Sequence, residues 1–242
     1  MKKQKSVFGG IILIINGLMK MTLLDFPGRV ACTVFTAGCN MRCPFCHNAL
    51  LVTDIHNEDK IEEEDFFSFL EKRKGLLDGV AITGGEPLLQ KDIGDFIKRI
   101  KDMGFSVKLD TNGSFPEKLS EITESGEVDY VAMDIKNSPE KYTETVGVPG
   151  FDITPVKESV KILLNGKTDY EFRTTIVKEF HTVESIEKAA EWIKGAKRYF
   201  LQAFKDSGNL IGGNMSGVSK EEMELMKTAA EKYVSEVALR GI

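Results

Sequence analysis

The chain has 242 residues, of which 42% are apolar and 29% charged, a composition typical of a soluble globular protein and not of a disordered, collagenous or membrane protein. Its net charge of −5 lacks the excess of Lys and Arg that nucleic-acid binding requires, which excludes DNA and RNA as expected partners. All four cysteines lie between Cys32 and Cys46. A disulfide scaffold would spread them through a small secreted chain, so their clustering favours a metal or cluster site in a reducing, cytoplasmic environment.

The first residues carry a weak pattern. Three lysines at positions 2, 3 and 5 precede the apolar run 11–15, but no small-residue cleavage site follows and the run is too short to cross a bilayer. We therefore expect a first strand or an ill-defined start here, not an export signal, and no membrane contact. Because no Pro-rich or Gly/Ser-rich linker follows, we expect a single domain.

From residue 30 onward, predicted strands and helices alternate. Strands rich in β-branched and aromatic residues are predicted at 30–35, 79–83, 106–110, 130–133, 170–177 and 199–203. Helices with apolar residues three and four positions apart are predicted at 62–74, 93–100, 117–125, 156–164, 186–193 and 221–233. Six such units in succession predict an α/β fold with a parallel sheet.

Polar and glycine-rich motifs follow the predicted strands. The motifs Cys39–Cys46, Gly84–Pro87, Asp110–Gly113 and Asp134–Lys136 follow the first four strands, Glu171 and Arg173 lie on the fifth, and Gln202 lies near the end of the sixth. In parallel α/β folds the carboxyl ends of the strands meet at one edge, where ligands bind. We therefore expect these motifs to form one site.

Three cysteines have the spacing Cys39-x3-Cys43-x2-Cys46. Thiolates suit both zinc and iron–sulfur clusters, but a structural zinc site needs four ligands, usually in two separated pairs. Cys32 lies inside an apolar strand and is predicted to be a core residue, and His47 adjoins Cys46 too closely to join the same tetrahedron. With three cysteines, a cubane cluster keeps one iron free to bind a substrate or cofactor.

This spacing, with Phe45 before the last cysteine, resembles the radical S-adenosylmethionine (SAM) superfamily, whose fold is a partial (β/α)6 barrel. The motifs Asp25–Gly28, Cys46–Asn48, Thr83–Pro87, Asp110–Gly113 and Asp134–Lys136 narrow the resemblance to the activases of glycyl-radical enzymes. The run from residue 20 to 48 is most similar to the activating proteins of anaerobic ribonucleoside-triphosphate reductase. The resemblance covers most of the chain from about residue 17 onward, which implies a variable segment 1–16 and a single domain 17–242.

The resemblance implies a [4Fe-4S] cluster held by Cys39, Cys43 and Cys46, with SAM on the open iron. The cofactor carries the difficult chemistry, since its reductive cleavage yields a 5'-deoxyadenosyl radical that abstracts hydrogen. The implied SAM contacts are Gly84, Gly85 and Glu86 for the amino group, Lys136 and Arg173 for the carboxylate and ribose, and Phe45 for the adenine. Asp110, Thr111 and Asp134 are implied to hold a monovalent cation beside the SAM carboxylate.

Several of these residues also have a purely structural alternative to the role that the resemblance implies. Glycines at the end of a strand also form tight turns, and the Asn-Gly pair after Thr111 is a common turn sequence that would leave Asp110 as a surface carboxylate. Arg173 has Glu171 as an alternative partner inside the barrel, and Phe45 has packing beneath the cysteine loop as its alternative.

The resemblance implies an oxidoreductase that cleaves SAM reductively and takes a hydrogen atom from a glycine of a partner enzyme, most similar to the anaerobic ribonucleotide reductase system. Reduced flavodoxin or ferredoxin is the expected electron donor, because no cysteines remain for a second cluster and the 37 residues between Cys46 and Gly84 are too few for a ferredoxin-like insert. The alternatives are a pyruvate formate-lyase-type activase, a radical enzyme acting on a small molecule and, without catalysis, a zinc-binding or electron-transfer protein.

Overall fold

The computed structural model describes residues 13–54, 60–206 and 208–242. Residues 1–12 of the predicted variable segment lie outside this described part of the chain. The boundary predicted after residue 16 falls inside the first strand, β1 (Ile15–Thr22).

The described residues form one eight-stranded sheet in the order β1 to β8. After β1, the strands are β2 (Ala31–Thr36), β3 (Gly79–Gly84), β4 (Ser106–Thr111), β5 (Tyr130–Asp134), β6 (Asp169–Ile176), β7 (Arg198–Ala203) and β8 (Glu236–Arg240). The pair β1–β2 is antiparallel, and every other neighbouring pair is parallel. The sheet does not close, so β1 and β8 form its two edges.

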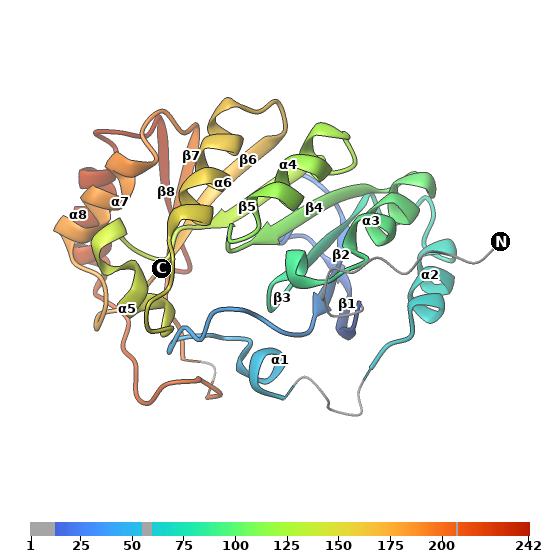
Figure 1. Cartoon of the computed structure of the whole chain (residues 1–242), viewed down its shortest axis with the longest axis horizontal. Coiled ribbons are helices and arrows are strands. Elements are labelled where there is room, and N and C mark those ends of the chain that lie inside the picture. Colours follow the sequence, from blue (N-terminus) through green and yellow to red (C-terminus); the bar gives the residue numbers. More distant parts are fainter. Residues whose placement is uncertain (1–12, 55–59, 207) are drawn as a thin grey trace.

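The helices lie mainly on one side of this curved sheet. They are α1 (Ala49–Thr53), α2 (Glu63–Glu71), α3 (Ile93–Asp102), α4 (Pro116–Glu124), α5 (Tyr142–Val146), α6 (Thr154–Asn165), α7 (Val183–Trp192) and α8 (Lys220–Ala230), with short 3-10 turns at Pro87–Leu89 and Pro139–Lys141. Figure 1 shows α3, α4, α6, α7 and α8 on the outer side of the sheet, while the segment that leads into α1 crosses the opposite side. That segment contains the three clustered cysteines.

Local sequence explains why these elements form. Helix α3 buries Ile93, Phe96, Ile97 and Ile100, which recur at helical spacing, against the sheet. In β3, Val80 to Ile82 are all buried, as expected for a parallel strand that is covered on both faces. The predicted α/β fold with parallel strands in an open barrel is thereby confirmed.

Of the two strands at the edges of the sheet, β8 was not predicted, whereas a first strand was one of the two expectations for the run 11–15 and β1 begins at Ile15. β1 carries exposed apolar and basic residues without a clean alternation, and β8 is a five-residue strand that follows the last helix directly. That helix was predicted to extend to residue 233 but ends at Ala230. β1 forms by pairing with β2, and β8 forms by pairing with β7. Such pairing with a neighbouring strand cannot be inferred from the residue pattern of the strand itself.

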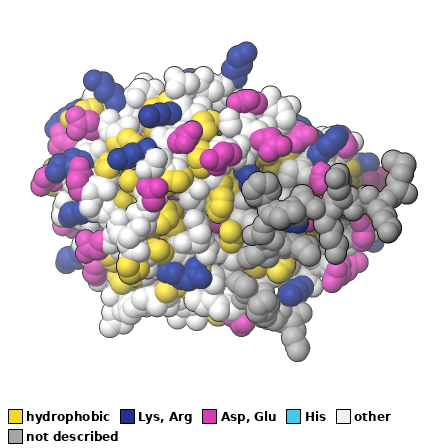
Figure 2. Space-filling view, in the orientation of Figure 1, with side chains coloured by type: hydrophobic (Ala, Val, Ile, Leu, Met, Phe, Trp, Pro, Cys, Tyr) yellow, Lys and Arg dark blue, Asp and Glu magenta, His cyan; other side chains and the backbone are white. Residues whose placement is uncertain are grey.

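The distribution of charged and apolar side chains agrees with the composition of the chain. On the face shown in Figure 2, basic and acidic side chains are interspersed rather than gathered by sign. Within residues 13–54, 60–206 and 208–242, no helix combines the length and apolar character needed to cross a membrane. Cys32 is fully buried in the main hydrophobic core, as predicted.

Candidate active site

A pocket of about 410 Å³ lies at the carboxyl ends of the parallel strands. Eleven of the twelve predicted site residues line it, namely Cys39, Cys43, Phe45, Cys46, Gly84, Gly85, Asp110, Thr111, Asp134, Lys136 and Arg173. The twelfth, Glu86, is not among the lining residues. The motifs that follow separate strands therefore come together at one edge, as predicted, but Glu171 does not line the pocket with them.

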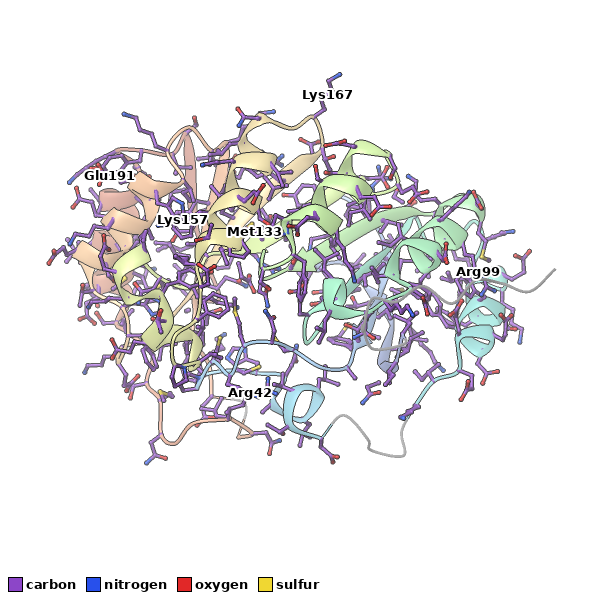
Figure 3. The ribbon with its side chains drawn as sticks, in the orientation of Figure 1. Arg42, Arg99, Met133, Lys157, Lys167 and Glu191 are labelled. Carbon is purple, nitrogen blue, oxygen red and sulfur yellow. The ribbon has the colours of Figure 1, made fainter. Side chains whose placement is uncertain are left out.

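The cysteine loop is held in shape by Arg42, which Figure 3 shows on the segment crossing beneath the sheet. The Arg42 guanidinium Nη1 donates hydrogen bonds to the carbonyl oxygens of Cys39 at 2.6 Å and Met41 at 2.8 Å. The Arg42 backbone N–H donates to the carbonyl of Val146, at the end of α5, at 2.9 Å. These bonds satisfy backbone groups that no strand or helix would pair, and they fix the loop against the barrel.

The three thiols of the loop are largely shielded from water. Burial raises the pKa of Cys39 to about 12 and that of Cys43 to about 11, and it also raises the pKa of Cys46. The charge of Lys136 lowers the pKa of each thiol, but by less than burial raises it. The free thiols are therefore protonated at neutral pH, and ligation must displace their protons.

The three thiols that line the pocket suit an iron–sulfur cluster better than a zinc ion. In the part of the chain that the structure describes, no three His, Cys, Asp or Glu side chains converge on one point closely enough to hold a single ion. A mononuclear zinc site needs four ligands around one point, and Cys32 cannot supply the fourth because it lies in the core. A cubane binds each cysteine at a different iron, so three thiols lining one pocket fit a cluster with one open iron.

Gly84, the last residue of β3, and Gly85, which follows it, let the cysteine segment approach closely. Gly84 has φ +124°, and a Cβ built on Gly85 would lie 1.9 Å from the carbonyl oxygen of Gly38. In turn, the Gly85 N–H donates to the Thr36 carbonyl at 2.9 Å, and Asn48 Nδ2 donates to the Gly84 carbonyl at 3.1 Å. The pair thus makes a tight turn and also presents bare backbone to the pocket.

Glu86 does not line the pocket but joins the ends of β3 and β4 beneath two residues that do, Thr111 and Asn112. Its carboxylate accepts hydrogen bonds from Thr111 Oγ1 at 2.8 Å, from the Asn112 N–H at 2.7 Å and from the Leu88 N–H at 3.0 Å. Burial raises the pKa of Glu86 to about 7 in spite of these donors. In this arrangement the Glu86 side chain positions the loop after β4.

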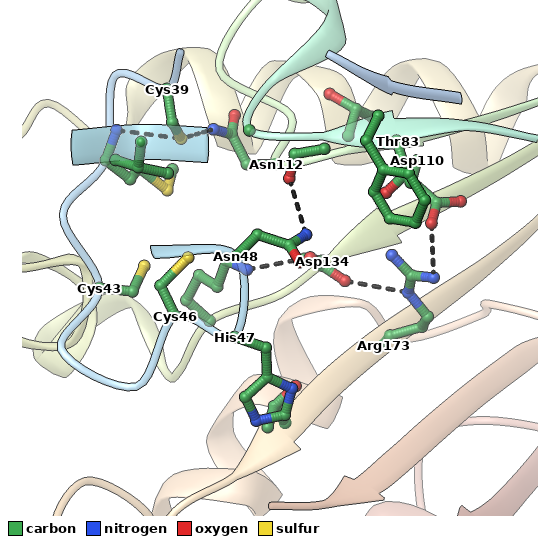
Figure 4. Close-up of a pocket in the computed structure, with 18 of the residues that line it drawn as sticks. Cys39, Cys43, Cys46, His47, Asn48, Thr83, Asp110, Asn112, Asp134 and Arg173 are labelled. Carbon is green, nitrogen blue, oxygen red and sulfur yellow. Dashed lines mark hydrogen bonds and ion pairs between the residues drawn. The ribbon is translucent and has the colours of Figure 1, made fainter. Parts of the chain in front are cut away.

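Charged side chains from three neighbouring strands form a network on the side of the pocket opposite the three cysteines, as Figure 4 shows. Arg173 donates through Nη1 to Asp110 Oδ2 at 3.1 Å and through Nε to Asp134 Oδ1 at 3.0 Å. Lys136 Nζ donates to Asp134 Oδ2 at 2.9 Å, and Lys108 Nζ donates to Asp110 Oδ1. Asp110 is therefore a half-buried partner in an ion network and not the surface carboxylate of a turn.

The charges in this network set its protonation. Burial alone would raise the pKa of Asp134, but the charges of Arg173 and Lys136 outweigh it and lower the pKa to about 2. The pKa of Asp110 is lowered in the same way, with Arg173 and Lys108 opposing the effect of burial. Both carboxylates are consequently ionised at neutral pH.

Glu171 takes a different partner from the one considered in the sequence. It accepts two hydrogen bonds from Arg240, at 2.7 Å and 2.9 Å, and one from the Tyr130 hydroxyl at 2.9 Å. The alternative in which Arg173 is occupied by Glu171 is therefore wrong, since Arg173 binds Asp110 and Asp134.

Sequence reasoning missed several lining residues. Asn112 donates to Asn40 Oδ1 at 3.0 Å and lies 3.7 Å from the Cys39 sulfur, and the His47 ring lies 5.3 Å from that of Phe204. His47, Asn48 and Asn112 belong to the motifs that carry the family resemblance, so membership of these motifs could have identified them as lining residues. Phe45 lines the pocket and its ring lies 5.7 Å from that of Phe180, so its packing role is confirmed, while contact with the adenine stays a prediction.

Comparisons with known proteins agree with this geometry. The family model of the radical SAM superfamily matches residues 33–193. The chain is 32% identical over 237 residues to a protein of Methanocaldococcus jannaschii named as a glycyl-radical enzyme activating enzyme, covering 95% of this chain and 96% of that one. It is 28% identical over 205 residues to the pyruvate formate-lyase-activating enzyme of Clostridium pasteurianum, covering 76% and 84% of the two chains.

A solved structure shares the fold. The radical SAM methyltransferase from Sphaerobacter thermophilus matches with a TM-score of 0.68 at 13% identity, covering 91% of this chain and 69% of that one. An open parallel sheet with three thiols beside its first parallel strand defines a radical SAM protein. This chain belongs to that superfamily and, within it, to the family of glycyl-radical enzyme activating enzymes.

Proposed function

We propose that this protein takes a hydrogen atom from a backbone glycine of a partner enzyme and leaves a glycyl radical there, with anaerobic ribonucleoside-triphosphate reductase as the target. The observation that carries the proposal is the single pocket lined by three thiols, two glycines and the ion network. When bound, the [4Fe-4S] cluster and SAM supply the one-electron chemistry that generates a hydrogen-abstracting radical.

The chain's own residues hold and orient these groups. Cys39, Cys43 and Cys46 would ligate the cluster, and the bare backbone of Gly84 and Gly85 would face the amino group of SAM. Lys136 and Arg173 carry the positive charge that suits its carboxylate and ribose, with Arg173 offering a planar fork of donors. Phe45 would pack beside the adenine, and Glu86 would hold the loop containing Thr111 in place.

The choice of target rests on the run from residue 20 to 48, which is most similar to the activating proteins of the reductase. The proposed electron donor is reduced flavodoxin or ferredoxin, because Cys32 is buried in the core and supplies no ligand for a second cluster. A cytoplasmic location follows for a protein whose thiols must stay reduced.

The partner's glycine loop would enter beside β1. Met19 on this edge strand lines the pocket, and Met21, Leu23 and Leu24 extend from it with exposed fractions of 65%, 69% and 91%. Exposed apolar side chains on an edge strand are normally avoided, since they invite association. We assign this surface, here called the β1 rim, to an extended loop of the glycyl-radical enzyme, because it is continuous with the pocket through Met19.

The decisive experiment is electron paramagnetic resonance of the purified reductase after anaerobic incubation with this protein, SAM and reductant. A glycyl-radical signal that is absent with Cys43→Ala and present with Cys32→Ala is expected. A reconstituted protein that binds one zinc and shows no iron–sulfur absorbance would refute every radical function.

Pyruvate formate-lyase is the second candidate target, and similarity to the Clostridium pasteurianum activating enzyme favours it. Parallel incubations with the two partner enzymes separate the candidates, since only the true partner gains a glycyl radical at substoichiometric activase. SAM cleavage that requires a small metabolite, with no radical on either enzyme, would instead assign a small-molecule substrate.

A further inference from the structure

A buried lysine lies where the family resemblance predicts a monovalent cation. Lys108 and Asp110 are two residues apart on β4, so their side chains share the face of the strand that looks into the barrel. Lys108 is 2% exposed, and its ammonium group contacts Asp110 Oδ1 directly. This places a fixed positive charge beside one of the carboxylates expected to bind the cation.

The oxygens expected to bind the cation are already engaged. Asp110 presents Oδ1 to Lys108 and Oδ2 to Arg173, and Asp134 presents Oδ1 to Arg173 and Oδ2 to Lys136. Thr111 Oγ1 donates to Glu86 and accepts from the Gly113 N–H. A metal cation would have to share each of these carboxylate oxygens with an ammonium or guanidinium group, so the residues of this chain do not fit the predicted cation site.

The charge balance leads to the same conclusion. Lys108, Lys136 and Arg173 carry three positive charges against the two negative charges of Asp110 and Asp134, which leaves one net positive charge. One excess positive charge complements the single carboxylate of SAM. An added sodium or potassium ion would double the excess and would lie close to three cationic side chains.

We propose that the Lys108 ammonium replaces the monovalent cation, so that SAM binding in this protein does not depend on sodium or potassium. The inference rests on the proposed function only in placing SAM in this pocket. Lys108 acts as a positioning residue, because it holds Asp110 and through it Arg173, which faces the cofactor site.

The first test needs no variant. SAM affinity of the reconstituted protein is measured by calorimetry in sodium, potassium or choline chloride at equal ionic strength. We expect the dissociation constants to agree within about twofold, since the built-in charge is present in every buffer. A loss of about tenfold or more in choline would overturn the inference.

The second test uses Lys108→Met, which keeps the length of the side chain and removes its charge. In choline this variant should bind SAM about tenfold more weakly than wild type, as expected for losing one charge-assisted contact, and potassium or sodium should restore part of the loss. Lys108→Arg should retain cation-independent binding.

The control is Lys98→Met, which removes an exposed charge on α3 and should bind SAM as wild type does in all three salts. Unchanged affinity of Lys108→Met in all three salts would overturn the inference.

A third measurement separates this inference from the proposed function. Without cofactors, the melting temperature of Lys108→Met should rise when choline is replaced by potassium, because an ion that binds the folded state stabilises it, while wild type should not respond. A wild-type response equal to that of the variant would refute the role of Lys108. If wild type bound no SAM in any salt, the proposed function would fail while this melting experiment still decided the role of Lys108.

Discussion

Single residues with the same chemistry have different roles here because their surroundings differ. Cys32 and Cys43 are both buried thiols, yet Cys32 packs in β2 within the core while Cys43 lines the pocket beside a lysine. Burial raises the pKa of Cys32 to about 12 with no cation to oppose it. The difference divides the four cysteines into three ligand candidates and one core residue.

Alanine variants should separate these two groups. Cys39→Ala, Cys43→Ala or Cys46→Ala should each abolish the visible iron–sulfur absorbance after reconstitution while leaving the fold intact by circular dichroism. Cys32→Ala should keep the cluster and lower the free energy of unfolding by about 1 kcal/mol, because it removes a buried sulfur from a packed core. Loss of the cluster in Cys32→Ala would show that Cys32 is a ligand.

Glu86 should give the protein a characteristic pH dependence. Its pKa is raised from 4.5 to about 7 by burial, so the folded state binds a proton that the unfolded state has released in this range. Stability from this group is therefore complete below about pH 4.5 and is lost as the pH rises through 7, by on the order of 3 kcal/mol.

The measurement is urea unfolding of wild type and Glu86→Gln between pH 4.5 and 8. At low pH the variant should be less stable than wild type, because its amide cannot accept all three hydrogen bonds. Its free energy of unfolding should not fall as the pH rises through 7, whereas that of wild type should. The lowered pKa values of His47 and His181 produce the opposite slope in both proteins, so the difference between the two curves isolates Glu86. Parallel curves would contradict the assignment.

At the scale of elements, the site depends on how closely the cysteine segment packs on the end of β3. The Glu86 N–H donates to the Gly38 carbonyl at 2.8 Å, and the missing side chain of Gly85 makes room for that carbonyl. The turn after β3 and the cysteine segment therefore form one unit, in which a change in the turn is transmitted to the thiols.

Gly85→Ala should break this unit. A Cβ 1.9 Å from a backbone oxygen forces the two segments apart, and we expect a loss of roughly 2 kcal/mol in the free energy of unfolding together with weaker SAM binding. Gly94→Ala is the matched control, because it lies in α3 with nothing within 4 Å of the added Cβ and should be neutral or stabilising by about 0.5 kcal/mol. Equal thermal stability of the two variants would refute the close-packing argument.

At the scale of the whole molecule, the open sheet determines where a partner can reach the pocket. The sheet ends at β1 on one edge and β8 on the other, and the apolar side chains of the β1 rim lie at the first of these edges. Thr22 pairs with Ala31, the first residue of β2, so the β1 rim lies toward the amino ends of the parallel strands, and a partner loop that enters there would reach the pocket past Met19.

Polar substitutions at the β1 rim should impair activation without affecting the cofactor. The double variant Leu23→Ser, Leu24→Ser should lower the initial rate of glycyl-radical formation roughly fivefold at limiting partner concentration, because apolar contact area is lost. SAM affinity should not change. Leu225→Ser is the control, because this exposed residue lies on α8, near the β8 edge. An equal rate for the rim variant and the control would exclude the β1 rim as the docking surface.

Much of this protein follows from local sequence. Apolar residues at helical spacing in α3 and consecutive buried residues in β3 are properties of short segments, so the succession of strands and helices was predictable. The three-cysteine spacing and the motifs at the strand ends are equally local. Their convergence followed because parallel strands bring their carboxyl ends to one edge of the sheet.

Tertiary structure alone decided which side chains meet. Arg173 could pair with Glu171 on its own strand, but β5 and β6 align it with Asp134, and Glu171 binds Arg240 from β8. The pairing of the edge strands and the contacts of Glu86 with the loop after β4 likewise depend on neighbours distant in the chain, whereas Lys108 meets Asp110 two positions along the same strand. The physical reason is that register and burial are set by long-range packing, while periodicity and motif spacing are set by residues a few positions apart.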